Sequence, residues 1–138
     1  MIMHISHTVE INDSVENVWK RLSSLEGLET YLPIVNKSKV DGTGIGAIRI
    51  SEINMGNQYF QIREKIQEFD DFKHSFTTLL EDAPIQIRGM KFNFLLYSQG
   101  EKKSNLTMST NVVNPDAQST AKNHFEMIGQ GLKRIHEI

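Results

Sequence analysis

The stretch that decides the fold reads D-G-T-G-I-G-A-I-R, from Asp41 to Arg49. Its first part, Gly42–Ala47, fits the relaxed pattern G-x-G-x-x-A of a dinucleotide-binding loop, and Glu64 stands about where a ribose-binding acid is expected. Such a loop has to lead into a helix whose N-terminus faces the pyrophosphate. The residues that follow are instead rich in β-branched side chains and soon reach a turn at Gly56. We therefore interpret the stretch as a hairpin turn between two strands.

On both sides of this turn, short β-prone segments alternate with turn residues such as Gly, Asn, Asp and Pro. The connections are too short for crossover helices, so the strands are expected to pair in antiparallel fashion. A half-buried strand near the N-terminus, with alternating apolar and polar residues, completes the set. The expected strands are Met3–Ile11, Val35–Val40, Ala47–Ile53, Gln58–Phe69, Lys73–Leu80, Gln86–Tyr97 and Asn105–Val113.

Helical spacing occurs after the first expected strand and again at the end of the chain. A capping box of Asp13 and Glu16 predicts the start of a short amphipathic helix, and Leu25–Leu32 is expected to form a second, weaker helical turn. The segment Ala117–Ile138 predicts one long helix, because its apolar residues recur every three or four positions. These apolar residues are Ala117, Ala121, Phe125, Ile128, Leu132 and Ile135.

Two glycines interrupt this long helix. Gly129 and Gly131 lie well inside it, where each costs about 1 kcal/mol relative to Ala. They indicate either a close contact between the helix and the sheet or space left for a ligand. The sequence does not distinguish these two roles.

Length and composition indicate one globular domain that spans residues 1–138. The net charge of -2 comes from 15 basic and 17 acidic residues spread along the chain, which argues against a nucleic-acid partner. The absence of cysteine excludes disulfides, thiolate zinc sites and a cysteine nucleophile. Because no signal segment and no long apolar run is visible, we expect a cytoplasmic protein without membrane insertion, as a monomer or homodimer.

Five short motifs follow one another over nearly the whole chain: H-T-V-E-I-N-D-S-V-E-N-V-W, L-P, D-G-T-G-I-G-A-I-R, E-K-I-Q-E-F-D-D and G-L-K-R-I. Together they resemble the polyketide cyclase/dehydrase-like branch of the SRPBCC superfamily, also called the START or helix-grip superfamily. The resemblance implies an α+β fold, in which a curved, seven-stranded antiparallel sheet wraps around the long C-terminal helix. Two short helices are expected between the first and second strands. Members of the superfamily bind or transform very different lipophilic molecules, so the resemblance predicts the fold more closely than the function.

Glu64 is the most informative candidate residue, because it shares the parity of the apolar Phe60, Ile62 and Ile66 in its strand. A buried carboxylate needs a cation or hydrogen-bond donors. The alternation of the preceding strand leaves the face of Arg49 undecided. The resemblance implies that Arg49 and Glu64 face the cavity, as the matching residues do in related pocket proteins such as the plant abscisic-acid receptors. We therefore expect an interior ion pair, which either satisfies itself or orients a polar group of a ligand.

The five histidines do not have the spacing of a metal site. His4 and His7 point to opposite faces of a strand, and His124 and His136 are far apart along a helix. His7 and His74 share the apolar parity of their strands. Each is expected either as a core histidine with a hydrogen-bond partner or as a group that lines a cavity. We expect no metal and no cofactor.

The preferred function is the binding of a small hydrophobic molecule, lipid-like, aromatic or polyketide-like, between the sheet and the C-terminal helix. One alternative is a cyclase or dehydratase that uses His7, His74 or Glu64 as general acid or base. Another is a regulatory module gated by the loop at Gly56, although the receptor patterns S-G-L-P and H-R-L are missing. Core packing is the other role open to the apolar candidates. The candidate ligand contacts are His7, Arg49, Ile53, Phe60, Ile62, Glu64, His74, Phe76, Met90, Phe92, Phe94, Met108, Thr110, Phe125 and Ile128.

Overall fold

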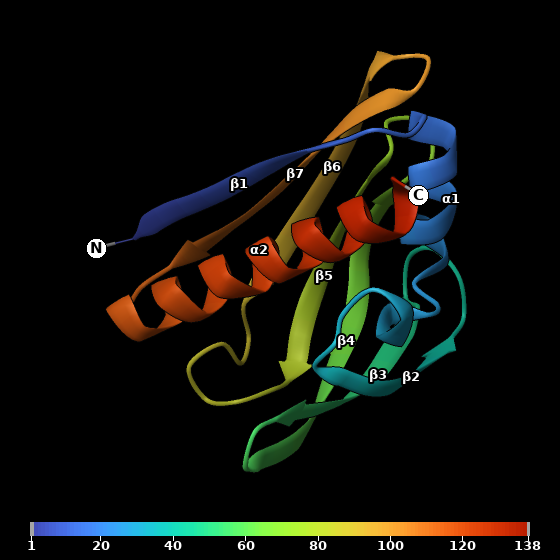
Figure 1. Cartoon of the computed structure of the whole chain (residues 1–138). Helices are drawn as coiled ribbons and strands as arrows, with labels where there is room; N and C mark the ends of the chain where they lie inside the picture. The colour runs from blue at the N-terminus through green and yellow to red at the C-terminus, as the bar shows by residue number, and fades with distance from the viewer. Residues whose placement is uncertain (1, 138) are drawn as a thin grey trace.

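The computed structural model describes residues 2–137 of the chain. Within this range, seven antiparallel strands form one curved sheet in the order β1-β7-β6-β5-β4-β3-β2, and the long helix α2 lies across its concave face (Figure 1). This arrangement confirms the predicted helix-grip fold. The strands are β1 (Met3–Ile11), β2 (Val35–Asp41), β3 (Ile48–Met55), β4 (Gln58–Asp70), β5 (Ser75–Asp82), β6 (Lys91–Gly100) and β7 (Lys103–Val112). The helices are α1 (Val15–Ser24), the short 3-10 helix η1 (Leu28–Thr30) and α2 (Pro115–His136).

The hydrophobic core fills the space between the concave face of the sheet and the helices. Strand β6 illustrates the alternation, since Phe92, Phe94 and Leu96 are buried while the residues between them are exposed. On α2, the predicted apolar stripe is also buried except for the half-buried Ile135, and Phe125 and Leu132 are wholly inaccessible to solvent. None of the helices within residues 2–137 is long and apolar enough to cross a membrane.

The hairpin interpretation of D-G-T-G-I-G-A is confirmed. The turn joins β2 to β3, and its three glycines, Gly42, Gly44 and Gly46, all have positive φ angles of 91°, 63° and 88°. A positive φ is readily available only to glycine, so the glycines serve the backbone of the turn. The turn places Arg49 two residues into β3.

Helix α1 begins one residue later than the sequence predicts. The N-cap is Ser14, whose side chain accepts a hydrogen bond from the Asn17 backbone N–H at 3.2 Å, so the predicted capping box of Asp13 and Glu16 is wrong. The carboxylate of Asp13 accepts instead from the Ser14 N–H and the Asn17 side chain, at 2.8 and 2.9 Å. Asp13 and Ser14 thus both accept hydrogen bonds at the start of α1. Asp13 also bonds to His136 at the end of α2. The predicted turn at Leu25–Leu32 is reduced to η1.

Two strand starts were predicted too early by two residues or more. Strand β6 begins at Lys91 rather than at Gln86, because the backbone N–H groups of Ile87 and Arg88 both bond back to the Pro84 carbonyl and close a turn. Strand β5 begins at Ser75 rather than at Lys73, because His74 has a left-handed φ of 58° that belongs to the preceding turn. Both errors follow from extending an alternating pattern into a turn.

The helical glycines mark a close contact and not a space for a ligand. A Cβ atom added at Gly131 would lie 1.8 Å from the carbonyl oxygen of Tyr31, and one at Gly129 would lie 3.2 Å from the side chain of Val9. The Arg134 guanidinium donates a hydrogen bond of 3.1 Å to the same Tyr31 carbonyl. Helix α2 is thus held against both β1 and the segment that follows η1.

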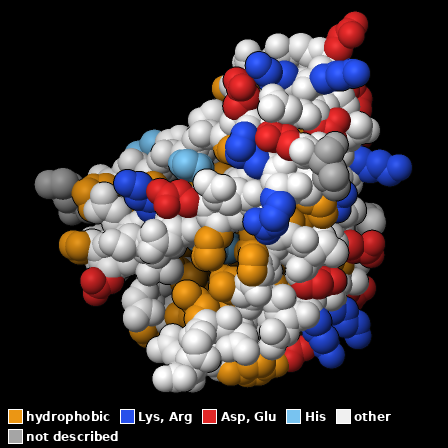
Figure 2. Space-filling model, viewed as in Figure 1, with side chains coloured by type: hydrophobic (Ala, Val, Ile, Leu, Met, Phe, Trp, Pro, Cys, Tyr) orange, Lys and Arg blue, Asp and Glu red, His pale blue; other side chains and the backbone are white. Residues whose placement is uncertain are grey.

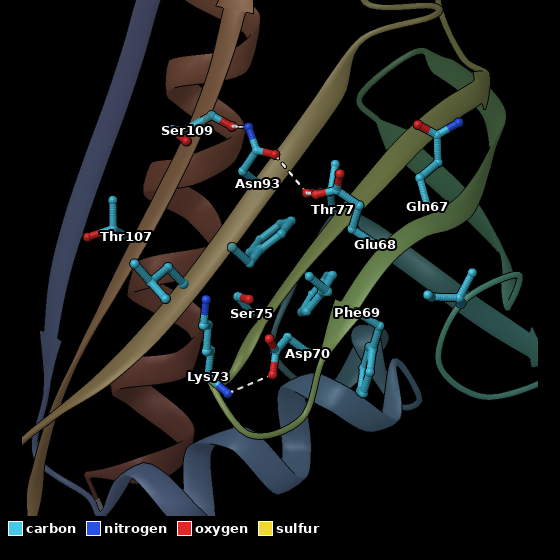
Figure 3. Close-up of a pocket in the computed structure, with 14 residues that line it drawn as sticks. Gln67, Glu68, Phe69, Asp70, Lys73, Ser75, Thr77, Asn93, Thr107 and Ser109 are labelled. Atoms are coloured by element: carbon cyan, nitrogen blue, oxygen red, sulfur yellow. Dashed lines mark hydrogen bonds between the residues drawn. The ribbon is translucent and has the colours of Figure 1, made fainter.

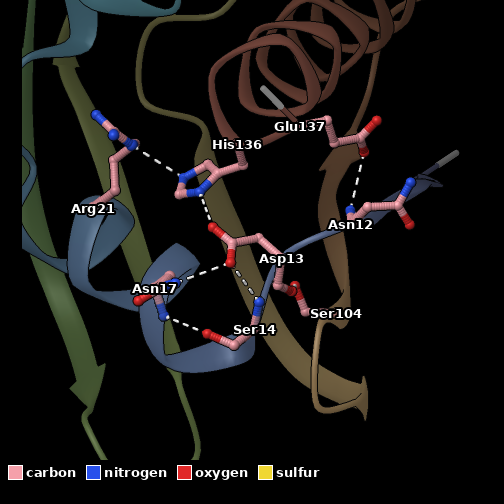
Figure 4. A network of polar contacts seen from close by, with 8 residues as sticks. All are labelled: Asn12, Asp13, Ser14, Asn17, Arg21, Ser104, His136 and Glu137. Atoms are coloured by element: carbon pink, nitrogen blue, oxygen red, sulfur yellow. Dashed lines mark hydrogen bonds and ion pairs between the residues drawn. The ribbon is translucent and has the colours of Figure 1, made fainter.

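A polar network fastens the end of α2 to the start of α1 (Figure 4). His136 Nδ1 lies 2.7 Å from Asp13 Oδ2, and Arg21 Nε donates to His136 Nε2 at 3.0 Å. Because Nε2 accepts, the proton of the neutral ring is on Nδ1, which donates to Asp13. Burial on its own raises the pKa of Asp13, but the hydrogen bonds from Asn17, His136 and Ser14 outweigh it and hold this pKa below its usual value of 3.8.

The Asp13→Asn variant is expected to lose about 1–2 kcal/mol of unfolding free energy at pH 7, since hydrogen bonds to a charged acceptor are stronger than those to a neutral one. A carboxyl group with a lowered pKa stabilises the fold above its unfolded pKa of 3.8 and loses this contribution as the pH falls below it. The difference from wild type should therefore shrink at pH 3. Urea unfolding at both pH values measures it, with Asp41→Asn in the exposed hairpin as control. An equal difference at both pH values would contradict the assignment.

Candidate functional site

A cavity of about 260 Å³ lies between α2 and the concave face of the sheet. Figure 2 shows hydrophobic side chains that gather around a hollow in the lower middle of this view, just below the path of α2 in Figure 1. Most of its lining is apolar, and its polar members come from α2, from the start of β4 and from the turn before β6. The lining residues are Ile34, Ile53, Met55, Gln58, Phe60, Ile62, Pro84, Gln86, Ile87, Phe92, Thr120, Asn123, His124 and Met127.

A smaller inner pocket of about 20 Å³ adjoins this cavity. The two share the side chains of Ile53, Ile62, Ile87, Phe92 and His124, so they lie side by side between sheet and helix. The inner pocket also has polar groups in its wall. These are Ser51 from β3, Glu64 from β4 and His124 from α2.

The predicted ion pair is present in the interior. Arg49 and Glu64 are directly opposite each other on β3 and β4, and their side chains form two parallel contacts, Nε to Oε1 at 2.9 Å and Nη2 to Oε2 at 3.1 Å. A third guanidinium donor, Nη1, reaches the Leu25 carbonyl at 3.1 Å. The Thr78 hydroxyl donates to Glu64 Oε2 at 3.2 Å. With exposed fractions of 8% and 7%, both residues are buried, so protein encloses nearly all of the pair.

The face of Arg49 could not be read from β3 itself. Arg49, Ser51 and Ile53 are buried, whereas Ile48 and Ile50 are half-buried on the other face. Apolar side chains therefore occupy both parities of this strand. The register with β4 decides the matter, because Glu64 on the inward face of β4 stands opposite Arg49.

Both members of the pair are charged. Burial on its own raises the pKa of Glu64, but the neighbouring Arg49 charge and its hydrogen bonds outweigh burial and lower this pKa. Burial likewise opposes the charge of Arg49, and the Glu64 carboxylate restores it, so the pKa of Arg49 is raised. Next to the pair, burial raises the pKa of the Tyr31 hydroxyl. The interior thus contains two opposite charges that neutralise each other.

His124 is a cavity residue that the sequence interpretation missed. Its ring borders both the cavity and the inner pocket and packs on Phe92 with ring centroids 5.5 Å apart. Burial lowers the pKa of His124 to about 4, although the Glu64 carboxylate acts in the opposite direction. The ring is therefore neutral at pH 7. A signal was available, because His124 stands three residues after Ala121 and four before Ile128, on the apolar side of the helix.

Five predicted contacts line this region: Ile53, Phe60, Ile62, Glu64 and Phe92. Arg49 adjoins it through Glu64. The other buried candidates pack in the core, where Phe76 stacks on Phe94 at 4.7 Å and Phe125 meets Phe92 edge to face at 5.0 Å. The remaining apolar candidates and Thr110 are not among the lining residues; they are Met90, Met108 and Ile128, and the Thr110 hydroxyl bonds to the Lys91 carbonyl at 2.7 Å.

The two candidate histidines lie elsewhere. His74 sits in the turn before β5 and packs on Trp19 with ring centroids 5.3 Å apart. His7 on β1 is half-buried and lines an open groove beside α2, next to Val9 and Met127. Neither is among the residues that line the cavity or the inner pocket. Both were predicted to point inward, because they share the parity of the apolar residues in their expected strands. His74 lies in a turn instead, and His7 lies on β1, an edge strand far from β3 and β4.

Loops supply much of the lining that the sequence interpretation missed. Pro84, Gln86 and Ile87 come from the turn before β6, and Ile34 precedes β2. Strand periodicity does not apply to such segments, so no alternation could assign them a face. Thr120, Asn123 and Met127 come from the exposed edge of the apolar stripe on α2; the inner pocket adds Leu28, Leu32, Val35, Ser51 and Leu80.

A second hollow, of about 600 Å³, lies on the opposite face of the sheet, with α2 behind the strands (Figure 3). Its wall combines polar side chains, some of which bond to one another, with the apolar Ile45, Phe69, Phe76, Phe94 and Leu95, so it also contains the predicted contacts Phe76 and Phe94. Thr77 donates to Asn93 at 2.8 Å, and Asn93 donates to the Ser109 carbonyl at 3.4 Å. Within residues 2–137, no three His, Asp or Glu side chains are placed to hold a metal ion. The cavity under α2 is therefore the stronger candidate site.

Comparison with known proteins agrees with this geometry. The model of the family described as polyketide cyclase / dehydrase and lipid transport matches residues 3–93. The chain belongs to this family. The matched segment contains Arg49, Ser51 and Glu64 but ends before α2, so His124 lies outside it. A comparison with curated proteins gave no match.

Several solved structures share the whole fold. An uncharacterized protein from Bacillus thuringiensis is 20% identical and has a TM-score of 0.82 over 99% of this chain and 100% of its own. The XoxI protein from Bacillus cereus is also 20% identical, with a TM-score of 0.81 over 97% of this chain and 95% of its own. A START superfamily protein from Mycobacterium smegmatis is 14% identical, with a TM-score of 0.81 over 97% of both chains. Family and fold together indicate a START-like domain for a hydrophobic ligand.

Proposed function

We propose that the protein binds a small hydrophobic molecule, lipid-like, aromatic or polyketide-like, in the cavity between α2 and the sheet. The observation that carries the proposal is the shape and chemistry of this region. A mainly apolar cavity of about 260 Å³ adjoins a smaller pocket that has Ser51, Glu64 and His124 in its wall. Ligand sites in proteins commonly combine apolar walls with a few polar groups that fix the orientation of the ligand.

The Arg49–Glu64 pair supports a role for the polar end. Burying an ion pair costs desolvation energy that its attraction repays only in part, and apolar residues of similar volume often stabilise a fold equally well. Placed in the wall of a pocket, the pair provides a fixed dipole against which a polar part of a ligand is oriented. Its location is therefore better explained by binding than by stability.

The acid–base alternative has less support. His7 and His74 do not line the cavity, so two of its three candidate groups are away from a bound ligand. Glu64 accepts hydrogen bonds from Arg49 and Thr78, and these partners lower its pKa. A general base of low pKa is inefficient at neutral pH. Binding without turnover is thus the function that we put forward.

Native mass spectrometry of the purified protein tests the proposal. We expect a co-purifying lipophile, or a mass shift with members of a lipid and aromatic panel. The Thr120→Trp variant should lose this binding, because Thr120 is an exposed residue of α2 at the cavity wall, where an indole ring would fill the space. The expected loss is at least tenfold in affinity.

The neighbouring Ser119→Trp variant is the matched control. Ser119 is exposed on the same helix but does not line the cavity, so its replacement should leave binding unchanged. Equal binding by wild type and Thr120→Trp would place the ligand elsewhere. A wild-type protein that binds no member of the panel and carries no lipophile would contradict the proposed function.

A further inference from the structure

Ser51 is a buried polar group without a partner. Its residue is 1% exposed, and its Oγ atom finds no hydrogen-bond partner among residues 2–137. Buried hydroxyl groups in folded proteins are nearly always hydrogen-bonded, so an unpaired one requires an explanation. This hydroxyl belongs to a residue in the wall of the inner pocket, where a ligand atom would complete its bonding.

The charges around the inner pocket are already balanced. Arg49 uses two donors on Glu64 and a third on the Leu25 carbonyl, and Glu64 also accepts from Thr78. An added carboxylate would stand close to the Glu64 carboxylate, and an added ammonium would meet a Glu64 carboxylate whose charge Arg49 already balances. Either would bury a charge without a counter-charge, which is far more costly than burying a neutral group with a hydrogen bond.

The neutral His124 ring is a further reason to expect an uncharged ligand. Its ring borders the same pocket as Ser51 and Glu64, and burial keeps it without charge at pH 7. A neutral imidazole has one donor and one acceptor nitrogen, and a hydroxyl group can also donate and accept. The unpaired groups available to a ligand are therefore neutral ones.

The dimensions limit the ligand. The inner pocket, at about 20 Å³, has room for about one small polar group, close to the minimum that holds a water molecule. The outer cavity, at about 260 Å³, is slightly below the roughly 300–1,000 Å³ that is usual for ligand pockets. This combination fits a small molecule with one polar end rather than a long-chain lipid.

We propose that the cavity selects a small neutral amphiphile, whose hydroxyl or carbonyl oxygen bonds to Ser51 in the inner pocket while its apolar body fills the outer cavity. This proposal rests on the proposed function and specifies its ligand class. Fatty acids and amines of the same size are excluded by their charge.

Calorimetric titration with matched ligands tests the proposal. The probes are octan-1-ol, octan-2-one, octanoate and octylammonium, together with 3-phenylpropan-1-ol, 3-phenylpropanoate and 3-phenylpropylammonium. We expect the neutral members to bind at least tenfold more tightly than the charged members of the same skeleton. The Ser51→Ala variant should weaken binding of the neutral members by roughly 2- to 12-fold, the loss of one neutral hydrogen bond, and leave the charged members unchanged.

Two controls separate binding from folding. Ser6→Ala removes an exposed hydroxyl on β1 and should leave every affinity unchanged. The unfolding temperature of Ser51→Ala should equal or exceed that of wild type, because the variant removes a buried hydroxyl that has no partner.

Octanoate binding as tight as that of octan-1-ol would overturn the ligand class and leave the proposed function intact. If Ser51→Ala binds the neutral members as tightly as wild type does, the proposed ligand class is likewise overturned and the proposed function stands. If no probe binds while native mass spectrometry still detects a bound lipophile, only the ligand class fails. If both experiments are negative, the proposed function fails with it.

Discussion

Replacing Glu64 by Gln is expected to lower the unfolding free energy by about 3–5 kcal/mol, the usual effect of removing one member of a buried ion pair. The Gln side chain has nearly the same shape, so little packing is lost. It leaves the buried Arg49 cation without a counter-charge. The NH₂ group of the Gln amide also faces one of the two Arg49 N–H donors that contact a carboxylate oxygen in the wild type. Urea unfolding at pH 7 measures the change.

A double replacement distinguishes loss of charge balance from loss of the pair itself. In the Arg49→Met, Glu64→Leu variant no charge is buried, and we expect the stability to recover to within about 1–2 kcal/mol of wild type. The Thr78 hydroxyl and the Leu25 carbonyl lose a partner in this variant, which limits the recovery. The same variant should lose any preference for the orientation of a ligand.

The exposed pair of Arg63 and Glu81 is the matched control for Glu64→Gln. It likewise joins an arginine, here on β4, to a glutamate of the next strand, at 3.1 Å, but both side chains are reached by solvent. Glu81→Gln should therefore change the unfolding free energy by less than about 1 kcal/mol. A comparable effect at both sites would mean that burial does not govern the Arg49–Glu64 pair, and no effect at Glu64 would contradict its structural and ligand-orienting roles alike.

The Gly131→Ala variant is expected to be destabilised by about 3 kcal/mol, although Ala favours a helix over Gly by about 1 kcal/mol. The added Cβ would lie 1.8 Å from the Tyr31 carbonyl oxygen, which is backbone and cannot turn away as a side chain would. Helix α2 therefore has to move away from the segment that follows η1. This movement disturbs the hydrogen bond from Arg134 to the same carbonyl oxygen. Thermal and urea unfolding measure the effect.

Gly129→Ala is the matched control on the same helix. Its Cβ would lie 3.2 Å from the side chain of Val9, so a shift of a few tenths of an ångström accommodates it. The gain in helix propensity offsets this strain, and we expect a change within about 1 kcal/mol. A Gly131→Ala protein as stable as wild type would show that α2 can move away from Tyr31, contrary to the close contact described above.

The order of elements was readable from the sequence because it depends on local patterns. Alternation in Met3–Ile11, the glycines of the turn at Gly42, and the three-to-four spacing of Ala117, Ala121 and Phe125 each report the geometry of one segment. The inward face of Glu64 was also predicted, since Ile62 and Ile66 on the same face of the strand are apolar. The boundaries were less certain, as the late starts of β5 and β6 show.

The sequence by itself determined the strands, the long helix and the presence of a carboxylate on an apolar face. The tertiary structure alone decided which of these meet. The register of β3 against β4 selected the face of Arg49, and the path of α2 across the sheet brought His124 to Glu64 and Ser51 while it left His7 and His74 outside the cavity. Such contacts join residues far apart in the chain, and their energy depends on neighbours that no local pattern contains.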